Sequence, residues 1–490
     1  MEPKVLKMSP SMTATAAKPS TPLCVDLDGT LVKADTLVDS IFALVRQNPL
    51  AAFKLPVWLL RGKAGFKEEI GKRILLSAET LPYNQPLLEY IRAEHAAGRR
   101  IYLATASEER LADSIAKYLG LFSGVIATSG GKNLSGRAKL EAIQDLFPQQ
   151  QFAYIGNASP DQVLLKNAEV AMLANPSSGL VASLQRQGVP VAQVFEDRGS
   201  KFKALIRAMR ISQWPKNVLI FVPMLLAHIL FSKEKWLAAG IAFLCFSCTA
   251  SATYILNDLL DVESDRRHAR KRNRPFAAGE LSGKAGAALM LVLLAIAAGL
   301  TRLEPPRFVL CLGLYFVTTL AYSFVLKKIA LVDVLTLAGL YTVRLIAGAA
   351  ATHVPLSAWF QTFSLFFFLS LAVVKRYSEL HNLRQSGTTP KNGRGYQVDD
   401  IEQLRSFGTA SGYAAVVVFS LYINTPETAK LYSHPHWLWL MAPLLIYWIS
   451  RIWLLAHRGE LDEDPVVFAL TDRWSPLFAL IALIVMRGAL

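Results

Sequence analysis

The feature that most constrains this chain is a series of long apolar runs that begins shortly after residue 200. A helix that crosses a bilayer needs roughly 20 mostly apolar residues, because each residue adds about 1.5 Å along the axis. Several of nine candidate runs approach this length, and the shorter ones can be extended by their flanks: 216–231, 236–256, 285–301, 307–325, 330–351, 357–374, 408–424, 436–456 and 475–489. Hydrophobic residues make up 52% of the 490 residues, which is too many for an ordinary soluble enzyme. We therefore predict an all-α polytopic membrane bundle of about nine transmembrane helices in residues 213–490.

The distribution of Lys and Arg predicts how this bundle is oriented. The loops after the even-numbered runs hold most of the cations, and the opposite loops hold only Lys233, Lys235, Arg302, Arg307 and Lys430. Cytoplasmic loops carry the excess of cations. We therefore expect a multi-pass protein of a bacterial inner membrane, with its first half in the cytoplasm and its C-terminus outside. Anionic lipids and phosphates account for the net charge of +15, so no nucleic-acid partner is expected, and the oligomeric state stays open.

The first half of the chain has a different pattern, in which short apolar runs alternate with amphipathic stretches. The runs expected to form buried strands are 23–26, 100–105, 124–128, 152–156 and 168–173. Helical segments such as 108–119 and 139–146 lie between them. Strands that alternate with helices predict a parallel, doubly wound α/β sheet.

This α/β domain is expected to span 21–197, with three further segments in or beside it. Residues 1–20 are polar and rich in Ser, Thr, Ala and Pro, which predicts a disordered tail. Residues 33–85 are expected to form a helical cap, in which the apolar segment 53–60 packs inside the cap; contact of this segment with the membrane surface is the alternative. Residues 198–212 form a basic connector to the membrane half.

Two carboxylates follow the first expected strand, at Asp26 and Asp28. A carboxylate at the carboxyl end of a strand, with a second one two residues later, suits a nucleophile and a general acid/base around a metal ion. The segment Asp26-Leu-Asp28-Gly-Thr resembles the first motif of the haloacid dehalogenase (HAD) superfamily, whose phosphatases form an aspartyl-phosphate. The resemblance implies that Asp26 and Asp28 are catalytic residues and also ligands of Mg²⁺.

The other motifs of the HAD superfamily follow in order. The resemblance implies that Thr105 and Lys139 bind the phosphate, and that Asn157 and Asp161 complete the Mg²⁺ site. Asn157 departs from the family, which usually has Gly-Asp where this chain has Gly-Asn. An amide oxygen can still bind Mg²⁺, but the site loses one charge. Two interpretations stay open: an active phosphatase, which we favour, and a degenerate or regulatory domain.

An acidic motif stands where the second apolar run ends, with the sequence Asn257-Asp258-Leu-Leu-Asp261-Val-Glu-Ser-Asp265. The spacing of Asp258, Asp261 and Asp265 places three carboxylates on one face of a helix. Such a cluster repels itself unless a cation bridges it, and Mg²⁺ readily shares its shell between carboxylates and phosphates. A basic stretch that ends at Arg274 follows directly and supplies phosphate contacts. We predict a magnesium–diphosphate site here.

The acidic motif resembles the first aspartate motif of the UbiA superfamily of membrane transferases. The resemblance covers about 207–490 and implies Mg²⁺ ligands at Asn257, Asp258, Asp261 and Asp265, with Asp258 and Asp261 catalytic. The segment from Tyr322 to Lys327 also matches, and these two residues are expected to bind substrate.

The second aspartate motif of that superfamily is missing, and Lys375-Arg376-Tyr-Ser-Glu379 stands in its place. With Lys216 before the first run, and with the loop 458–472, this pattern resembles the polyprenyl-phosphate phosphoribosyltransferase branch. The resemblance implies that Lys216, Lys375, Arg376 and Glu379 bind substrate. Positive-inside anchoring is the alternative for Lys375 and Arg376, although it leaves the position of Glu379 without a reason.

Arg344 lies about 16 Å along the fifth run from Asp333, at 1.5 Å per residue. A charge at that depth is costly unless it faces a polar cavity. We expect Arg344 to bind substrate, with a phosphate or an acid of a neighbouring helix as its partner.

The resemblances imply one function and leave two rivals. The implied activity is transfer of phosphoribosyl from phosphoribosyl diphosphate to a lipid-linked polyprenyl phosphate, with Mg²⁺ in both domains. The adjacency of the two domains, and not a motif, adds the hypothesis that the HAD-like domain removes the 5-phosphate of the product. The first rival is a prenyltransferase that acts on an aromatic or other small acceptor. The second is a transporter-like bundle without enzymatic activity, against which the intact acidic motif argues.

Overall fold

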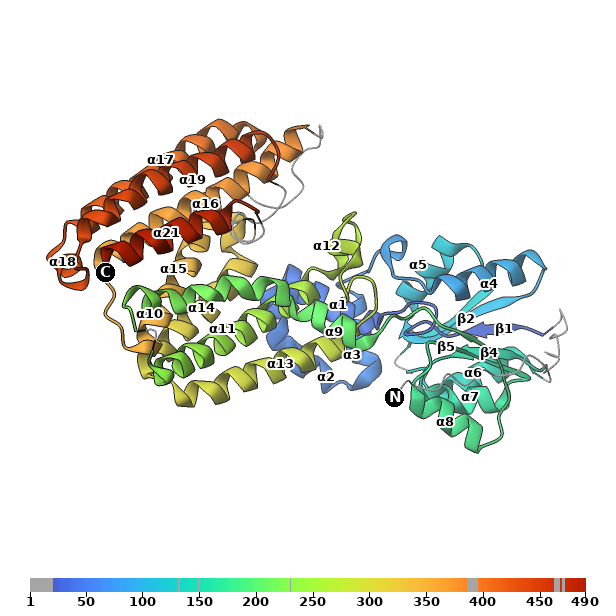
Figure 1. The fold of residues 1–490 in the computed structure, drawn as a ribbon. Helices are drawn as coiled ribbons and strands as arrows, with labels where there is room; N and C mark the ends of the chain where they lie inside the picture. The colour runs from blue at the N-terminus through green and yellow to red at the C-terminus, as the bar shows by residue number, and fades with distance from the viewer. Residues whose placement is uncertain are drawn as a thin grey trace. The chain divides into compact units, whose positions relative to one another are not determined.

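The structure is a computed structural model that describes residues 21–130, 133–148, 150–229, 231–385, 395–461, 468 and 472–490. Contacts within the chain separate two compact units (Figure 1). The first unit consists of Met1–Ala208 and Ile255–Ala288, and the second of Met209–Tyr254 and Leu289–Leu490. The tail expected at 1–20 lies outside the described residues.

The first unit is built on a six-stranded parallel sheet, which confirms the predicted fold class. Its strand order is β3-β2-β1-β4-β5-β6. The strands are β1 (Leu23–Val25), β2 (Ile101–Glu108), β3 (Gly124–Thr128), β4 (Ala153–Gly156), β5 (Val170–Ala174) and β6 (Val191–Phe195). The edge strand β6 was not predicted, because its three middle residues are exposed and it lacks the continuous apolar run of a buried strand.

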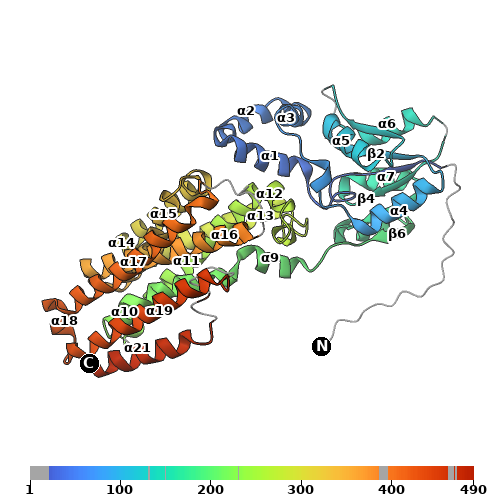
Figure 2. The ribbon, with the colours of Figure 1, turned by 90° about the horizontal axis from the view of Figure 1, so that it is seen from above.

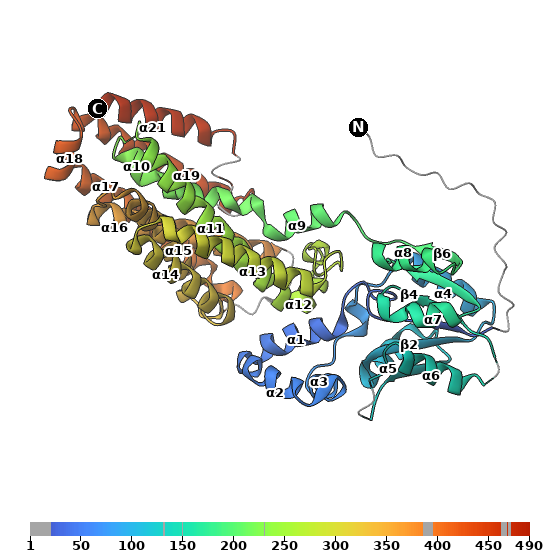
Figure 3. The same ribbon diagram turned by 90° about the horizontal axis from the view of Figure 1, so that it is seen from below.

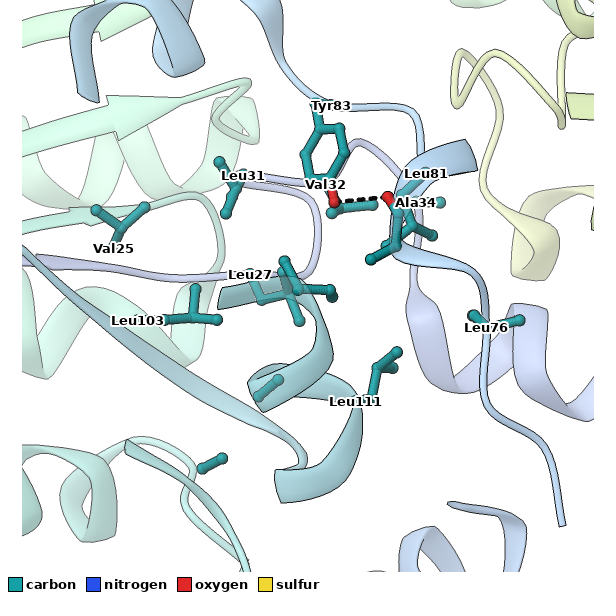
Figure 4. Close-up of a cluster of buried hydrophobic side chains, with 14 of the residues drawn as sticks. Val25, Leu27, Leu31, Val32, Ala34, Leu76, Leu81, Tyr83, Leu103 and Leu111 are labelled. Carbon is teal, nitrogen blue, oxygen red and sulfur yellow. Dashed lines mark hydrogen bonds between the residues drawn. The ribbon is translucent and has the colours of Figure 1, made fainter. Parts of the chain in front are cut away.

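Helices cover the sheet and bury its apolar side chains. These are α4 (Gln85–Ala96), α5 (Glu109–Leu119), α6 (Arg137–Leu146), α7 (Gln162–Asn167) and α8 (Ser178–Arg186). One cluster of buried side chains joins Val25 of β1 and Leu103 of β2 to Leu111 of α5 (Figure 4). Each such side chain contributes about 1.5–3 kcal/mol when it is removed from water.

The insert between β1 and α4 is helical, as expected of a cap. It contains α1 (Thr36–Gln47), the 3₁₀ helix η1 (Pro49–Lys54), α2 (Leu55–Leu59) and α3 (Gly62–Gly71), which Figures 2 and 3 show as a group beside the sheet. The expectation that the apolar segment 53–60 packs inside the cap is wrong for most of its side chains. Trp58 is buried, but Phe53 is 80% exposed and Leu60 is 88% exposed. Apolar residues at neighbouring positions of a helical segment point to different sides, so only some of them can face the cap interior.

The second unit is helical, and its elements follow the predicted runs. They are the 3₁₀ helix η4 (Ile211–Phe221), α10 (Val222–Leu226), α11 (Lys233–Leu260), α13 (Gly283–Leu300), α14 (Pro306–Phe324), η7 (Leu326–Lys328), α15 (Val332–Thr352), α16 (Ala358–Gln385), α17 (Ile401–Ile423), α18 (Pro426–Leu431), η9 (Pro435–Leu440), α19 (Met441–His457) and α21 (Ser475–Ala489). Residues 255–260 of α11 and 283–288 of α13 belong to the first unit.

Seven helices among the described residues are long and apolar enough to cross a membrane. They correspond to the second to eighth predicted runs, so the count of nine is not confirmed. The first run is divided between η4 and the five-residue α10, with Pro215 and Pro223 interrupting the backbone hydrogen bonding. The ninth run forms α21, which has 15 residues.

Small residues allow the helices of the second unit to approach closely. Gly348 of α15 is one such contact, because a Cβ atom at this position would overlap the backbone carbonyl of Ile220 in η4. Gly339 of the same helix has no atom within 4 Å of its ideal Cβ position among the neighbours considered. The two glycines therefore differ in what an added methyl group would meet.

This difference predicts opposite outcomes for two alanine substitutions. Gly348→Ala should lower stability by at least about 1 kcal/mol, since the overlapping atom is backbone and cannot rotate away. Gly339→Ala should leave stability unchanged or raise it by up to about 1 kcal/mol through helix propensity. Thermal unfolding of both variants in detergent, followed by size-exclusion chromatography, measures the difference. Equal melting temperatures would contradict the close packing of α15 on η4.

Candidate functional site

The predicted HAD residues meet at one edge of the sheet. Asp26 directly follows β1 and Asn157 directly follows β4, and these two strands are neighbours. Thr105 lies on β2, on the other side of β1. The strand order reverses direction between β1 and β4, where open α/β sheets form a crevice beyond their carboxyl ends. The predicted catalytic edge therefore exists as a spatial cluster.

Lys139 is the cation at the centre of this cluster. Its Nζ donates to Oδ1 of Asp26 at 2.7 Å and to the hydroxyl of Tyr154 at 3.1 Å, and lies 3.6 Å from Oδ1 of Asp161. Burial raises the pKa of Asp26 to about 7, although Lys139 opposes the shift. Burial also opposes the charge of Lys139, but the carboxylates of Asp26 and Asp161 outweigh it and raise the pKa of the lysine. The arrangement holds one ammonium group between two buried carboxyl groups.

Asp161 shapes the loop that carries Asn157. Its Oδ2 accepts hydrogen bonds from the backbone N–H groups of Asn157 and Ala158, both at 3.1 Å, and its Oδ1 accepts from Tyr154 at 2.8 Å. The side chain of Asn157 in turn lies against Gly29, where a Cβ atom would overlap its amide. Gly29 has φ +76°, so glycine meets both a steric and a conformational requirement here.

Asp28 connects the sheet to the cap. Its Oδ1 accepts from the backbone N–H of Thr36 at 2.7 Å, and its Oδ2 accepts from the hydroxyl of Ser107 at 2.5 Å. The hydroxyls of Thr36 and Ser107 are also 3.1 Å apart. Burial raises the pKa of Asp28, and nearby Asp35 adds to the shift. The backbone N–H of Ser107 also donates to the hydroxyl of Thr105 at 3.0 Å, which fixes that side chain.

Two polar residues near this edge were not predicted. Ser107 follows from the extension of β2 to Glu108, beyond the expected end of the strand. Lys67 of the cap helix α3 donates to the carbonyl of Ala106 at 2.6 Å and to Asn133 at 2.7 Å. Burial lowers the pKa of Lys67. No motif or spacing in the sequence signals a cap lysine that reaches the sheet.

The acidic motif is also assembled within the first unit, but not on one continuous helix. Helix α11 ends at Leu260, and α12 (Val262–Arg266) begins after Asp261, so the three carboxylates do not lie on one continuous helix as expected. Asp258 and Asp265 are both buried and accept from the same Nη1 of Arg274, at 3.1 and 2.6 Å. Burial raises the pKa of Asp265, although Arg274 opposes the shift.

Asp261 and Asn257 lie beside this pair of carboxylates. Oδ1 of Asp261 is 3.1 Å from Nε of Arg46, and the backbone N–H of Asp261 donates to the carbonyl of Asn257 at 2.9 Å. Within the described ranges, no three His, Cys, Asp or Glu side chains are grouped closely enough to hold a metal ion by themselves. The donor chemistry nevertheless fits Mg²⁺, which is typically bound through one or two carboxylates together with substrate phosphates. Asp258 and Asp265 already face one positively charged group, the guanidinium of Arg274.

The second unit contains a buried polar cluster around Arg376. Its guanidinium forms a two-point ion pair with Asp333, and its Nη2 donates to the hydroxyl of Tyr322 at 3.0 Å. Tyr322 donates to Asp333 at 2.7 Å, and Nη1 of Arg376 donates to Glu379 at 2.7 Å. Arg376 is 2% exposed, so positive-inside anchoring does not describe it. Asp333 was not predicted as a site residue, since one acid at the start of an apolar run forms no motif.

A second buried cluster lies around Arg344. Its Nε donates to Oδ1 of Asn217 at 2.8 Å and its Nη2 donates to the hydroxyl of Tyr315 at 3.1 Å. Its Nη1 donates to the carbonyl of Leu340 at 2.6 Å. The expected acidic partner is not among these contacts, because an amide, a phenol and a backbone carbonyl satisfy the donors instead. Asn217 is fixed by its own bond to Ser247 at 3.0 Å.

The remaining predicted phosphate ligands lie on separate elements of the second unit. Lys216 is buried on η4, with its Nζ 5.9 Å from the ring centre of Tyr341. Lys327 lies on η7 and Lys375 on α16. Most of the loop 458–472 lies outside the described residues, but Asp472 accepts two hydrogen bonds from Arg451, at 2.8 and 3.0 Å. The role of these cations in phosphate binding stays a prediction.

The helices that carry the Arg376 cluster also line an apolar groove of about 420 Å³. Its lining includes Val334 of α15, one residue from Asp333, and Val373 of α16, one turn before Arg376. Leu335, Phe366 and Phe407 extend the apolar surface. A hydrocarbon chain suits such an apolar lining, because it carries no hydrogen-bonding group that would need a partner there.

The Arg376–Asp333 pair predicts a strong dependence of stability on one carboxylate. Asp333→Asn should lower stability by about 3–5 kcal/mol, because it leaves a buried guanidinium without its counter-charge. The double variant Asp333→Asn/Arg376→Gln should recover part of this loss. Arg384→Gln, at an exposed position of the same helix, is the control and should melt like the wild type. Thermal unfolding in detergent measures all three, and an unchanged melting temperature for Asp333→Asn would contradict the pairing.

Comparison with known proteins finds a matching family for each part of the chain. A family model described as the UbiA prenyltransferase family matches residues 218–478, more than half of the chain. A family model described as a haloacid dehalogenase-like hydrolase matches residues 23–166.

Three relatives illustrate the match. The uncharacterized protein y4nM of Sinorhizobium fredii is 38% identical over 457 residues, which are 93% of this chain and 88% of that protein. The nodulation protein NoeC of Azorhizobium caulinodans is 36% identical over 274 residues, which are 55% of this chain and 88% of that protein. A decaprenyl-phosphate phosphoribosyltransferase of Mycobacterium tuberculosis is 32% identical over 281 residues, which are 56% of this chain and 90% of that protein. The first alignment is long enough to include both halves of the chain.

Proposed function

Because this chain belongs to the UbiA prenyltransferase family and carries a haloacid dehalogenase-like domain, we propose that it is a Mg²⁺-dependent membrane transferase. The proposed reaction moves phosphoribosyl from phosphoribosyl diphosphate to a polyprenyl phosphate. The observation that carries this choice of substrates is the match to a decaprenyl-phosphate phosphoribosyltransferase over 90% of that relative's length. The seven apolar helices and the family make the chain a multi-pass membrane protein.

The structure supports a donor site at the acidic motif. Asp258 and Asp265 face one cationic position, now held by Arg274, and would hold Mg²⁺ with Asp261 and Asn257 beside them. When bound there, Mg²⁺ would neutralise the charge that develops on the pyrophosphate leaving group. We assign Lys216, Arg274, Lys327, Lys375 and Arg376 to the remaining phosphate contacts, because guanidinium and ammonium groups bind phosphate oxygens strongly.

The transfer itself needs no protein nucleophile. A phosphate oxygen of the lipid attacks C1 of the ribose while the bond from C1 to the pyrophosphate oxygen breaks, and pyrophosphate leaves with the electron pair. The chain contributes alignment of the two substrates and fixed charges around the leaving group. The apolar groove beside Val334 and Val373 is proposed to hold the polyprenyl chain. Tyr322, Arg344 and Glu379 are proposed to support the substrate pocket through the buried clusters described above.

We further propose that the HAD-like domain removes the 5-phosphate from the transferase product. Asp26 would attack the phosphorus while the bond from phosphorus to O5 of the ribose breaks, and Asp28 would donate a proton to that leaving oxygen. Asp28 would then take a proton from the water that hydrolyses the aspartyl-phosphate, which releases inorganic phosphate and restores Asp26. Thr105 and Lys139 would hold the phosphate, and Asp26, Asp28, Asn157 and Asp161 would surround Mg²⁺. Joining the two activities in one chain raises the effective concentration of the product at the second site. We also propose that both sites face the cytoplasm at a bacterial inner membrane, with the C-terminus outside, because the cations gather in the loops on that side.

Asp261→Ala should abolish the transfer, reducing it by at least about 100-fold, because the acidic motif loses a charge that the metal–diphosphate complex requires. The assay supplies the full-length protein with Mg²⁺, a short-chain polyprenyl phosphate and radiolabelled phosphoribosyl diphosphate, and counts label in the lipid phase. Glu263→Gln is the matched control, since Glu263 lies in the same segment and pairs with the exposed Arg267. Wild-type labelling of lipid by Asp261→Ala would refute the assignment of the donor site.

Asp26→Asn should separate the two activities. The variant is expected to keep the transfer and to accumulate the product that still carries its 5-phosphate, because only the nucleophile of the HAD-like domain is lost. Mass spectrometry of the lipid extract distinguishes the two products by the mass of one phosphate. If the wild-type protein also leaves the 5-phosphate in place, the HAD-like domain acts on another substrate or is degenerate.

A further inference from the structure

The cap helix α1 joins the two candidate sites of the first unit. At its start, the backbone N–H of Thr36 donates to Asp28 of the HAD site. Near its end, Nε of Arg46 lies 3.1 Å from Oδ1 of Asp261 in the acidic motif. The separation of ten positions spans about 15 Å at 1.5 Å per residue. One rigid element of the HAD-like domain therefore contacts a carboxylate that we assign to the transferase.

A buried ion pair fixes α1 against the segment that carries the acidic motif. Asp39 of α1 accepts from Nη2 of Arg266 at 2.7 Å, and the two side chains are 8% and 3% exposed. Arg266 also donates through Nε to the carbonyl of Ala277 at 3.1 Å. These bonds join the middle of α1 to Arg266, at the start of the basic stretch, and through Arg266 to Ala277, which follows that stretch. Because unpaired buried charges are very costly, this contact strongly favours one position of the helix.

Further contacts define the same interface. Asp35, the N-cap residue of α1, pairs with Lys284 at 2.8 Å. A Cβ atom at Gly283 would lie 2.6 Å from Cγ1 of Val38, so the helix packs directly on the backbone there. Ion pairs and side-chain packing therefore both hold α1 against this segment. Arg46 reaches Asp261 from a helix whose position is already determined.

We propose that Arg46 is a positioning residue of the transferase, which orients the carboxylate of Asp261 toward the bound cation. This inference rests on the proposed function of the acidic motif. Carboxylates that bind metals are themselves held by hydrogen bonds, and loss of such a partner typically weakens metal affinity 10–100-fold. A carboxylate has about four acceptor positions on two oxygens, so a hydrogen bond to Oδ1 is compatible with a cation on the same group. The HAD-like domain thereby serves the transferase whether or not it hydrolyses a phosphate.

Direct binding of Mn²⁺, in the presence of inorganic pyrophosphate, tests this role without relying on turnover. The full-length protein in nanodiscs is titrated, and free Mn²⁺ is followed by electron paramagnetic resonance. The binding class that disappears in Asp261→Ala identifies the acidic motif, and the class that remains serves as an internal control. Arg46→Ala should weaken only the first class, by about 10–100-fold. Arg46→Lys, which keeps a charge and donors, should show a smaller loss.

Arg61→Ala is the matched control, because Arg61 is a cap arginine that is mostly exposed and pairs with Glu69. It should bind Mn²⁺ like the wild type. Unchanged affinity in Arg46→Ala, while Asp261→Ala loses the class, would overturn the positioning role. Failure of the proposed function has a different signature: the Mn²⁺ class and its dependence on Arg46 would persist while phosphoribosyl transfer is absent.

Discussion

Compensation of buried charge is the constraint on which the candidate sites depend. Asp258 and Asp265 share the guanidinium of Arg274, Asp26 and Asp161 share the ammonium of Lys139, and Asp333 is paired with Arg376. In a medium of low dielectric constant, each of these charges would be costly alone. Pairing keeps the charges in place before a substrate arrives. A phosphate substrate that arrives with its cation can then replace one partner of such a pair without leaving a buried charge unpaired.

This balance of charges suits the phosphoryl and phosphoribosyl chemistry proposed above. Diphosphates carry several negative charges, and their departure is assisted by cations held in fixed positions. In the acidic motif, carboxylates and a guanidinium occupy the same small volume, so both a divalent cation and a phosphate find partners of opposite charge. In the second unit, the apolar groove begins within one turn of Arg376 in the helix sequence. A lipid with a phosphate head and a hydrocarbon chain has the matching distribution of properties.

The sequence predicts the features that arise from local pattern. Short apolar runs identified five of the six strands, and their alternation with helices identified the parallel sheet. The exposed edge strand β6 lacks that pattern, and Pro215 before the first apolar run and Pro223 within it interrupt the helix that its hydropathy predicts. Motifs also identified the residues at the edge of the sheet, from Asp26 to Asp161, which the fold brings together.

Contacts between distant positions could not be predicted in this way. Asp39 and Arg266 are separated by 227 positions, and although Arg266 begins the basic stretch, no motif links it to the cap. Asp333 and Lys67 stand alone in the sequence, so only the fold shows that Asp333 holds Arg376 and that Lys67 reaches the sheet from the cap. The break between α11 and α12 at Asp261 was hidden for another reason, since the i, i+3, i+7 spacing fits a continuous helix equally well.

The choice of donor substrate tests the proposed function most directly. The full-length protein in nanodiscs with Mg²⁺ is given two substrate pairs in separate reactions: phosphoribosyl diphosphate with a polyprenyl phosphate, and a prenyl diphosphate with a phenolic acid. Mass spectrometry identifies the products. We expect a ribosyl-phosphoryl lipid in the first reaction and no prenylated phenol in the second. A prenylated phenol without any ribosylated lipid would contradict the proposed function and would place the chain among the aromatic prenyltransferases.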